Sequence, residues 1–429
     1  MNPGGDGTQE GMRPSLLALL LAAALAGCRR HGSDGGPATG GLVAAFGAFG
    51  VITNDPGPGQ SDEIHALAID ADSMYVGGYD TGSARRRIEK RRLDDGSLVA
   101  AFGSGAGFVT FSSGFAPDDV AAIALDATSL YAVGVSTGSG TNQWCYEKRD
   151  RTTGALDPVF GAGTGRITTS LAGGNNQPAG IVLDGASMVV AGWDATQPLG
   201  NHQWRVEKRS LATGALDAAF ASGGVYTSNP SPWHDRAQAI ASDRGSAYIV
   251  GFQNYGGVAE SWRIEKLDLA SGIPDAAFGA IVANPGQYSE ARSIVVDANS
   301  IVVAGVSAWQ WRIEKRSRTT GALDPVFGGR SGVVTSDGYV ANAILTDGAS
   351  LWIVGTQTPG DEAWRIEKRD LVTGFLVESF GDGGVVVSNP SAGSDVLYAA
   401  AVDAEFLYLG GTDRQSGFDE EWRIEKRTR

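Results

Sequence analysis

Residues 364–385 contain the sequence WRIEKRDLVTGFLVESFGDGGV, and versions of this stretch recur along the whole chain. The dipeptide Glu-Lys occurs seven times, at spacings of 49 to 60 residues, with its glutamates at positions 89, 147, 207, 265, 314, 367 and 425. All seven lysines of the chain follow one of these glutamates. Self-similarity at a period of this length predicts a repeat architecture, so the repeat decides the fold.

Each repeat is expected to form four short strands. The first is an alternating run such as residues 121–125 and ends in an aspartate turn; a second apolar strand follows, as in residues 301–305. The third is the Trp-Arg-Ile-Glu-Lys-Arg segment, and a Thr-Gly turn and a Phe-Gly pair lead to the fourth. Short strands between glycine-rich turns, without helical periodicity, indicate an all-β protein. Four strands per unit predict a seven-bladed β-propeller whose blades are antiparallel sheets.

The two ends of the chain predict how the ring closes. The repeats open at Leu42 with the tail of a unit, and the chain stops at Arg429 just after a third strand. The last blade therefore lacks its outer strand, which residues 51–54 can supply. Such a latch would remove a free sheet edge from the ring.

The stretch 364–385, preceded by residues 351–355, resembles the delta-60 repeat β-propeller family. The resemblance rests on an aromatic-rich strand, a Thr-Gly or Asp-Gly turn, Leu-Asp-x-x-Phe-Gly and Gly-Gly-x-Val, and it covers residues 42–429. It implies a bacterial envelope scaffold and names no reaction. Blade 1 departs from the pattern, because Arg86 stands where the other six repeats have tryptophan.

The repeated charged residues are interpreted as structural. Alternation in the third strand places Trp311, Ile313 and Lys315 on one face, with Arg312, Glu314 and Arg316 on the other. We expect the tryptophan to fill the core between blades and the glutamate to be paired with its flanking arginines, since buried charge persists only when paired. The same expectation covers these repeat residues: Trp311, Glu314, Lys315, Trp364, Glu367, Lys368, Trp422, Glu425 and Lys426. The aspartate turns are interpreted as hairpins capped by the side chain rather than calcium loops.

The N-terminal residues predict where in the cell the protein is located. An apolar run from Leu16 to Ala26 is about eleven residues long, which suits a signal peptide and is too short to span a membrane. Residues 25–28, Leu-Ala-Gly-Cys, resemble the lipobox of bacterial lipoproteins, in which the cysteine is acylated. We therefore expect a signal peptide at 1–27, a lipid on Cys28, a flexible tether at 28–41 and the propeller at 42–429. Arg29 after the cysteine favours the outer membrane, by resemblance to lipoprotein sorting.

Composition excludes several function classes. A net charge of −14 argues against nucleic-acid binding, and two cysteines cannot form a disulfide framework. The four histidines show no metal-binding spacing, and no nucleophile elbow or phosphate loop is present. Adjacent acids in loops, such as Asp118-Asp119, are interpreted as chance pairs rather than as a catalytic acid and base. The sequence thus predicts no catalytic residue, no metal and no cofactor, and it favours a protein that is not an enzyme.

Two connections vary in length between repeats, and both are expected on one face of the propeller: that between strands two and three, and that between strand four and the next blade. Variable loops on a rigid scaffold commonly carry function. The aromatic and histidine residues on this candidate recognition face are Tyr79, Trp193, His202, Trp233, His234, Tyr255, Tyr288, Trp309 and Tyr339. We expect an envelope lipoprotein whose propeller binds or scaffolds a glycan or a protein partner. The alternative is an envelope hydrolase or lyase that acts on saccharides at the channel mouth.

Overall fold

The computed structural model describes residues 39–81, 85–114, 118–138, 140–195, 201–254, 260–283, 288–357, 362–416 and 419–429. Cys28, the predicted signal peptide and Tyr255 lie outside these residues. Residues 38–429 form one compact unit. Within the described residues, no helix has the length and apolar character needed to cross a membrane.

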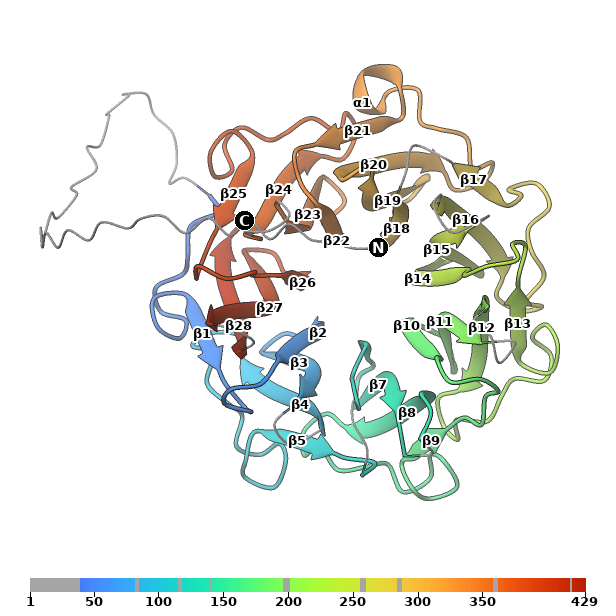
Figure 1. The fold of residues 1–429 in the computed structure, drawn as a ribbon, viewed down its shortest axis with the longest axis horizontal. Coiled ribbons are helices and arrows are strands. Elements are labelled where there is room, and N and C mark those ends of the chain that lie inside the picture. Colours follow the sequence, from blue (N-terminus) through green and yellow to red (C-terminus); the bar gives the residue numbers. More distant parts are fainter. Residues whose placement is uncertain are drawn as a thin grey trace, which may run out of the picture. The chain divides into compact units, whose positions relative to one another are not determined.

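The unit is the predicted seven-bladed β-propeller, with four antiparallel strands in every blade (Figure 1). Blade 1 consists of β2 (Asp62–Ile69), β3 (Ser73–Asp80), β4 (Arg85–Arg92) and β5 (Phe108–Phe111), and blade 2 of β6 (Ala122–Leu125), β7 (Ser129–Ser136), β8 (Gln143–Asp150) and β9 (Arg166–Thr168). Blade 3 consists of β10 (Gln177–Asp184), β11 (Ser187–Ala195), β12 (His202–Ser210) and β13 (Val225–Ser228). Blade 4 consists of β14 (Arg236–Asp243), β15 (Ser246–Asn254), β16 (Glu260–Asp268) and β17 (Ile281–Ala283). Blade 5 consists of β18 (Ser289–Val296), β19 (Ser300–Ser307), β20 (Gln310–Ser317) and β21 (Val333–Ser336). Blade 6 consists of β22 (Val340–Thr346), β23 (Ser350–Thr356), β24 (Trp364–Asp370) and β25 (Val385–Ser388). Blade 7 consists of β26 (Leu397–Val402), β27 (Phe406–Ser416), β28 (Asp419–Thr428) and β1 (Val51–Asn54). A single turn, α1 (Phe327–Arg330), precedes β21.

The predicted latch is confirmed. β1 pairs antiparallel with β28 over Val51–Asn54 and completes blade 7. The closure extends further towards the N-terminus than the outer strand. Arg427 donates a hydrogen bond to the carbonyl of Gly40 at 2.8 Å, whereas in blade 6 Arg369 donates to Gly374 of the Thr-Gly turn at 2.7 Å. Gly40 therefore supplies the turn that the last repeat lacks, and its φ of +94° is one that glycine adopts without strain.

The core lies between the blades. One apolar cluster joins Val302, Trp311 and Phe327 of blade 5 to Ile344 and Ile353 of blade 6, and six similar clusters join the other neighbours. Each repeat tryptophan also donates its indole N–H to a carbonyl of the next blade: Trp144 to Trp193, Trp204 to Phe252, Trp262 to Val306, Trp311 to Thr356, Trp364 to Thr412 and Trp422 to Tyr79. The interpretation of tryptophan as interblade core is confirmed.

Arg86 completes this ring of interblade hydrogen bonds. It is 1% exposed and donates from Nη2 to the carbonyl of Val135 at 2.8 Å, the contact that a tryptophan makes in the other six blades. Arg86 Nη1 also lies 3.6 Å from the buried carboxylate of Glu147. The departure of blade 1 from the repeat pattern thus preserves the hydrogen bond and changes only the donor.

The repeated Arg-x-Glu-x-Arg pattern forms buried ion pairs, as expected. Glu314 is fully buried and accepts from Arg312 Nε and from Arg316 Nε, both at 2.7 Å, one at each carboxylate oxygen. Lys315 reaches across the blade boundary and donates to the carbonyl of Leu371 at 3.0 Å. Five of the seven aspartate turns are capped as predicted; Asp70 Oδ1, for example, accepts from the backbone N–H groups of Asp72 and Ser73. At Asp184 and Asp243 the two strands are joined by a two-residue hairpin instead.

Candidate functional site: the channel mouth

A β-bulge in the first strand of six of the seven blades aims one side chain into the central channel. In β2 the pairing skips His65 between Ile64 and Ala66, and the same shift occurs in β10, β14, β18, β22 and β26. A bulge frees one residue from the ladder and re-aims its side chain. The residues at this position, with Ala121 as the blade 2 equivalent, are His65, Ala121, Ala179, Gln238, Arg292, Asn342 and Tyr398.

These bulge residues line a cavity of about 190 Å³ in the channel, together with Asp119, Gln177, Pro178 and Trp193. Its wall is mostly polar, although the first strands are otherwise built from alanine, valine, leucine and isoleucine. The other end of the channel differs. There a cavity of about 650 Å³ is lined mainly by apolar side chains, among them Ile181, Ile240, Ile294 and Leu345. The two ends of the channel therefore differ in the side chains beside them, while both have polar as well as apolar surface.

A buried aspartate or asparagine fixes the mouth loops in five blades. Asp62 accepts from the backbone N–H of Gly57 in the loop before its strand and from that of Thr81, nineteen residues later, in the hairpin after β3. Asp118, Asn176, Asp235 and Asp395 make equivalent contacts. This contact joins the two variable connections of a blade, which confirms that they lie on one face.

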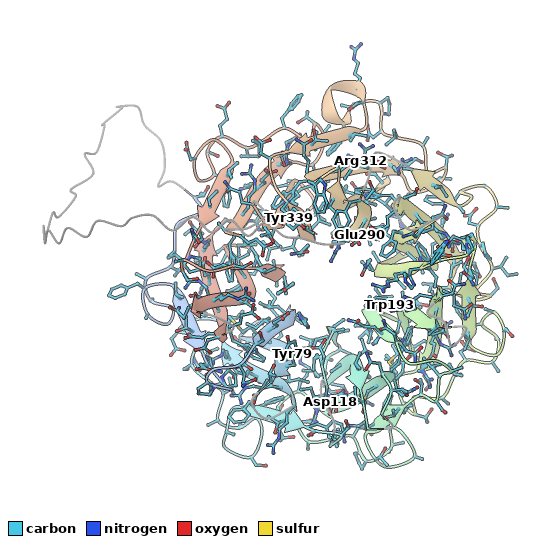
Figure 2. The ribbon with its side chains drawn as sticks, in the orientation of Figure 1. Tyr79, Asp118, Trp193, Glu290, Arg312 and Tyr339 are labelled. Atoms are coloured by element: carbon cyan, nitrogen blue, oxygen red, sulfur yellow. The ribbon has the colours of Figure 1, made fainter. Side chains whose placement is uncertain are left out.

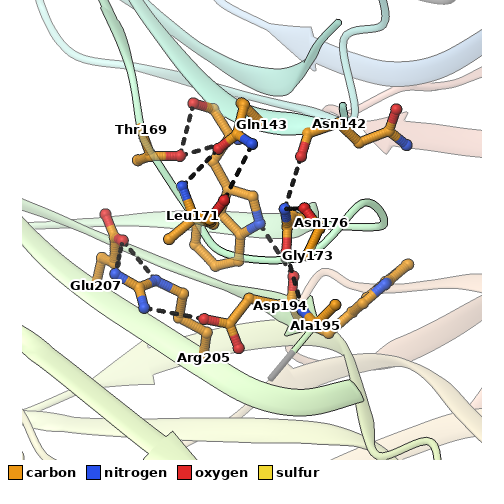
Figure 3. A network of polar contacts seen from close by, with 12 residues as sticks. Asn142, Gln143, Thr169, Leu171, Gly173, Asn176, Asp194, Ala195, Arg205 and Glu207 are labelled. Carbon is orange, nitrogen blue, oxygen red and sulfur yellow. Dashed lines mark hydrogen bonds and ion pairs between the residues drawn. The ribbon is translucent and has the colours of Figure 1, made fainter. Parts of the chain in front are cut away.

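Figure 3 shows this clamp in blade 3, where it also joins the neighbouring blade. Asn176 Oδ1 accepts from the backbone N–H of Ala195 at 2.9 Å, and Nδ2 donates to the carbonyl of Asn142 in blade 2 at 2.7 Å. Arg205 bridges the carboxylates of Glu207 and Asp194 in the same region. Hydrogen bonds and ion pairs within the protein therefore fix the loops of blade 3 at the channel mouth.

In blades 5 and 6 the clamp position holds neither aspartate nor asparagine, and an aromatic stack lies beside it. The equivalent positions are Ser289 and Tyr339, which follow from the pairing of β18 and β22. Trp309 stacks on Tyr288, with ring centroids 4.5 Å apart and planes 17° apart, and on Tyr339, with values of 5.4 Å and 4°. Trp309 remains 54% exposed. The two blades without an acidic or amide clamp residue are thus those that present aromatic surface beside the opening; Tyr339 is labelled there in Figure 2.

The stack is held by unusual backbone geometry. β19 and β20 are joined by only two residues, Ala308 and Trp309, whose φ values are +50° and +65°. A two-residue hairpin with positive φ at both positions normally contains Asn-Gly or similar pairs, because side chains with Cβ are strained there. Tyr288 also has a positive φ, +51°. Such strain commonly accumulates at functional sites, where the surroundings maintain it.

Arg292 connects the stack to the channel cavity. Its guanidinium lies against the hydroxyl of Tyr288 and forms an ion pair with Glu290 at 2.5 Å, while its side chain lines the cavity. Tyr288, Glu290 and Arg292 lead along one strand from the rim into the channel. The aromatic stack and the cavity are therefore adjoining parts of one site.

A carboxyl pair lies beside Arg292. Glu260 and Glu290 are within hydrogen-bonding reach of each other, and Glu290 is buried. Burial and the adjacent Glu290 carboxylate raise the pKa of Glu260 to about 7, so this carboxyl group is partly protonated at neutral pH. Two acids that cleave a glycosidic bond are separated so that the bond lies between them. Acids in direct contact do not favour that chemistry.

On the opposite side of the mouth, His65 lies between two carboxylates from adjacent blades. Its Nε2 is 2.8 Å from Glu63 and its Nδ1 is 3.0 Å from Asp119. Both ring nitrogens face acceptors, which requires an imidazolium ion. Burial lowers the pKa of His65, but Asp119 and Glu63 together raise it to about 10. Asp118-Asp119 is therefore not a chance pair: Asp118 is a clamp, and Asp119 binds His65.

The remaining residues of the predicted recognition face have different environments. Trp193 and His202 are buried, at 6% and 2% exposed, and the His202 ring lies tilted against that of His234 with centroids 4.3 Å apart. The Tyr79 hydroxyl donates to Glu63 at 2.6 Å. Trp233 is 52% exposed on the loop between β13 and β14, and it takes part in none of the ring contacts of the described residues. Of the predicted face residues, the structure brings Tyr288, Trp309 and Tyr339 together in an accessible platform.

No known protein family matches the chain, and no curated protein matches it. Solved structures with a similar fold include a subtype N11 neuraminidase-like protein of A/flat-faced bat/Peru/033/2010 (H18N11), at 14% identity and a TM-score of 0.41, covering 72% of this chain and 86% of that one. Others are the Dos1 propeller (9% identity, TM-score 0.45, 86% and 93% covered) and an acylaminoacyl peptidase bound to a chloromethyl ketone (10%, 0.49, 86% and 52%). These similarities concern the fold alone.

Proposed function

We propose that the protein is a binding module of the bacterial cell envelope and that its channel mouth binds a carbohydrate chain. The observation that carries this proposal is the stack of Trp309 on Tyr288 and Tyr339. It presents an exposed aromatic surface to solvent, it is assembled from two blades, and it is held on a strained hairpin. The flat, C–H-bearing face of a sugar ring packs on such a surface, while the sugar hydroxyls need nearby polar groups.

The polar groups beside the stack fit a hydroxyl-rich ligand. Arg292 and the carboxyl pair Glu260–Glu290 lie at the foot of Tyr288, and amides line the cavity behind them. Trp309 and Trp233 are the two exposed tryptophans of the described chain, and Trp233 stands apart from the stack.

The test compares two tryptophans of equal exposure. We expect the purified protein to migrate more slowly in native gels that contain a soluble α-1,4-glucan, a β-1,3-glucan or a β-1,4-linked N-acetylglucosamine polymer. Trp309→Ala should lose at least tenfold in affinity for the retained polysaccharide, about 1.4 kcal/mol, whereas Trp233→Ala should bind like the unmodified protein. Equal loss in both variants, or no retention by any polymer, would contradict the proposal.

Attachment to the membrane is part of the same proposal and rests on residues 25–28. Acylation of Cys28 would hold the binding module at a membrane surface, because a multiply acylated terminus binds more strongly than a single chain does. Cells that express the protein should incorporate labelled palmitate into it, and Cys28→Ser should abolish both the label and membrane fractionation. Labelling that persists in the Cys28→Ser variant would refute this part.

A further inference from the structure

We infer that the outer edge of blades 6 and 7 lies against the lipid bilayer that holds the anchor, with Phe49 and Phe375 inserted at the level of the lipid headgroups. This inference rests on the proposed acylation of Cys28 and does not depend on the ligand at the channel mouth. It follows from the apolar side chains on this edge, from their departure from the repeat, and from the place where the chain enters the ring.

Large apolar side chains are exposed mainly in the connections between the third and fourth strands. Within the described residues, the exceptions are Trp233 and Trp309 on the mouth loops and Val282 and Val387 on fourth strands. Figure 1 shows the connections at the outer edge of the ring. Six of these side chains belong to the consecutive blades 5, 6 and 7: Leu323, Val326, Val372, Phe375, Leu42 and Phe49. Exposed apolar side chains that gather on one part of a surface indicate contact with a partner or a membrane.

Phe49 departs from the repeat in a way that the fold does not require. In the same turn before the outer strand, blades 3 and 6 have Gly223 and Gly383, with φ values of +63° and +61°. Phe49 has a φ of +58° and is 81% exposed. Glycine adopts this conformation without strain and a residue with a Cβ does not. Phe49 is therefore both strained and almost fully exposed to solvent, and its contribution to stability does not explain its presence.

Blade 6 departs from the repeat at its Thr-Gly turn, where Val372 and Phe375 are 57% and 58% exposed. Arg369 donates to the carbonyl of Gly374 in this turn, as the equivalent arginines do in other blades. The other repeats mostly have small or polar residues at the two positions: Asp94, Thr152, Ala212, Ala270 and Thr319 for Val372, and Ser97, Ala155, Ala215, Ile273 and Ala322 for Phe375. The turn thus forms without large apolar side chains.

The chain enters the ring between these two departures. The carbonyl of Thr39 accepts from the backbone N–H of Gly381 in blade 6 at 2.9 Å, and the N–H of Gly40 donates to the carbonyl of Thr428 in blade 7 at 2.8 Å. Cys28 precedes Thr39 by eleven residues, which can span at most about 40 Å. An acyl group on Cys28 would therefore keep the edge formed by blades 6 and 7 within this distance of the bilayer.

The distribution of charge favours apolar insertion. Residues 39–50, which form the connection of blade 7, contain no charged side chain, whereas each of the other six connections contains at least one. This segment can approach a lipid surface without the cost of removing a charge from water. Blade 6 retains Glu378 and Asp382, both exposed, which anionic headgroups would repel. Insertion of apolar side chains, rather than attraction between charges, would hold this edge, so the contact should persist at high ionic strength.

The experiment places a tryptophan on the edge and measures its contact with lipid. Acylated protein with Phe49→Trp or Phe375→Trp is reconstituted in vesicles of phosphatidylethanolamine and phosphatidylglycerol, with or without bromine on the acyl chains. Bromine quenches tryptophan fluorescence at short range. We expect the brominated lipid to quench at least half of the added emission, at low and at high ionic strength. Adding Phe49→Gly should weaken the quenching of the Phe375→Trp protein.

The matched control is Ile273→Trp. Ile273 is 64% exposed in the same connection of blade 4, on the opposite side of the ring (Figure 1), and its tryptophan variant should not be quenched beyond the unmodified protein. The ten native tryptophans all lie outside these connections, so the unmodified protein supplies the background.

The possible failures can be distinguished. Quenching of Phe49→Trp and Phe375→Trp that is no greater than that of Ile273→Trp would overturn the inference and leave acylation and carbohydrate binding standing. Quenching that disappears at high ionic strength would also overturn it, because charge would then hold the edge. If the protein is neither acylated nor bound to membranes, the proposed attachment and this inference fail together, while Trp309→Ala still tests carbohydrate binding.

Discussion

At the scale of single residues, the positions that break the repeat pattern are the most informative. Arg86 and Trp309 both depart from what the other blades do at the same place. Arg86 keeps the interblade hydrogen bond with a different donor, so it is a structural substitution. Trp309 occupies a strained hairpin and remains half exposed. An Asn-Gly pair would stabilise the same turn better, so the contribution of Trp309 to stability does not explain its presence.

The strain at Ala308 predicts a stabilising substitution. Ala308 is exposed with a φ of +50°, a conformation that glycine adopts without strain, so Ala308→Gly should raise the free energy of unfolding by about 0.5–1 kcal/mol. Ala298→Gly, in an exposed turn of the same blade with ordinary φ, should lower it slightly. Chemical denaturation of both variants measures the difference. A destabilised Ala308→Gly protein would show that the hairpin is not strained.

Arg86 should be as important to the fold as the tryptophans it replaces. Arg86→Ala leaves the Val135 carbonyl without its donor and opens a cavity between blades 1 and 2, so we expect a loss of about 3 kcal/mol. The neighbouring Arg85 is exposed, and Arg85→Ala should change the free energy of unfolding by less than about 0.5 kcal/mol. Equal effects of the two substitutions would refute the role assigned to Arg86.

At the scale of strands and blades, the bulged first strands define the site. The third-strand pairs Arg-Glu-Arg, the capped aspartate turns and the interblade tryptophans could be predicted from the sequence, because the repeat shows each of them several times in register. The channel residues could not. Gln238 lies in Ala-Gln-Ala and looks like an ordinary outward position of an alternating strand, and the bulge that turns it into the channel is visible only in the pairing.

The clamp residues were missed for a similar reason. Asp62, Asp118, Asn176, Asp235 and Asp395 follow loops of different length and sequence, so they do not align by eye with the repeat. Their partner nineteen residues later is a backbone N–H group, which any residue type supplies, so this constant distance is visible only in the structure.

The ion cluster of Glu63, His65 and Asp119, which joins β2 to the segment before β6, should make stability depend on pH. The pKa of His65, raised to about 10 from 6.5, contributes stability that is complete below about pH 6.5 and is lost as the pH rises through 10. The pKa of Glu63, lowered to about 2 from 4.5, contributes stability above pH 4.5 that is lost as the pH falls through 2. His65→Gln should therefore cost most between about pH 4.5 and 6.5.

Thermal unfolding at pH 6 and pH 9.5 tests the direction of this pH dependence. The difference in midpoint between the unmodified protein and His65→Gln should shrink at the higher pH. His234→Gln is the matched control, because burial and Arg236 lower the pKa of His234 and its neutral form is already favoured. A His65→Gln penalty that grows with pH would contradict an imidazolium between Glu63 and Asp119.

At the scale of the whole molecule, the blade count, the strand order and the closing strand could be predicted because the spacing of the repeats encodes them. The position of Gly40 in the closure could not, since the sequence around it is too short to align with confidence to a Thr-Gly turn. The ring depends on residues 40–54, which supply β1, the turn carbonyl and the fully buried Phe46 of the cluster between blades 7 and 1.

Removing the latch should destabilise the entire ring. A chain that begins at Asp55 lacks the four-residue ladder on β28 and the buried side chain of Phe46, so we expect a loss of about 5 kcal/mol in the free energy of unfolding. A chain that begins at Ala38, where the compact unit starts, serves as the control. Identical denaturation midpoints for the two chains would show that the closure is dispensable.

The most direct test of carbohydrate recognition at the stack uses the exposure of the tryptophans. Of the ten tryptophans, all of which lie in the described residues, Trp233 and Trp309 are the exposed ones. In a Trp233→Phe protein, quenching of fluorescence by acrylamide therefore reports on Trp309. We predict that a saturating hexasaccharide protects this fluorescence from acrylamide. Unchanged quenching of Trp309 with maltohexaose, laminarihexaose and chitohexaose would contradict the proposed carbohydrate site.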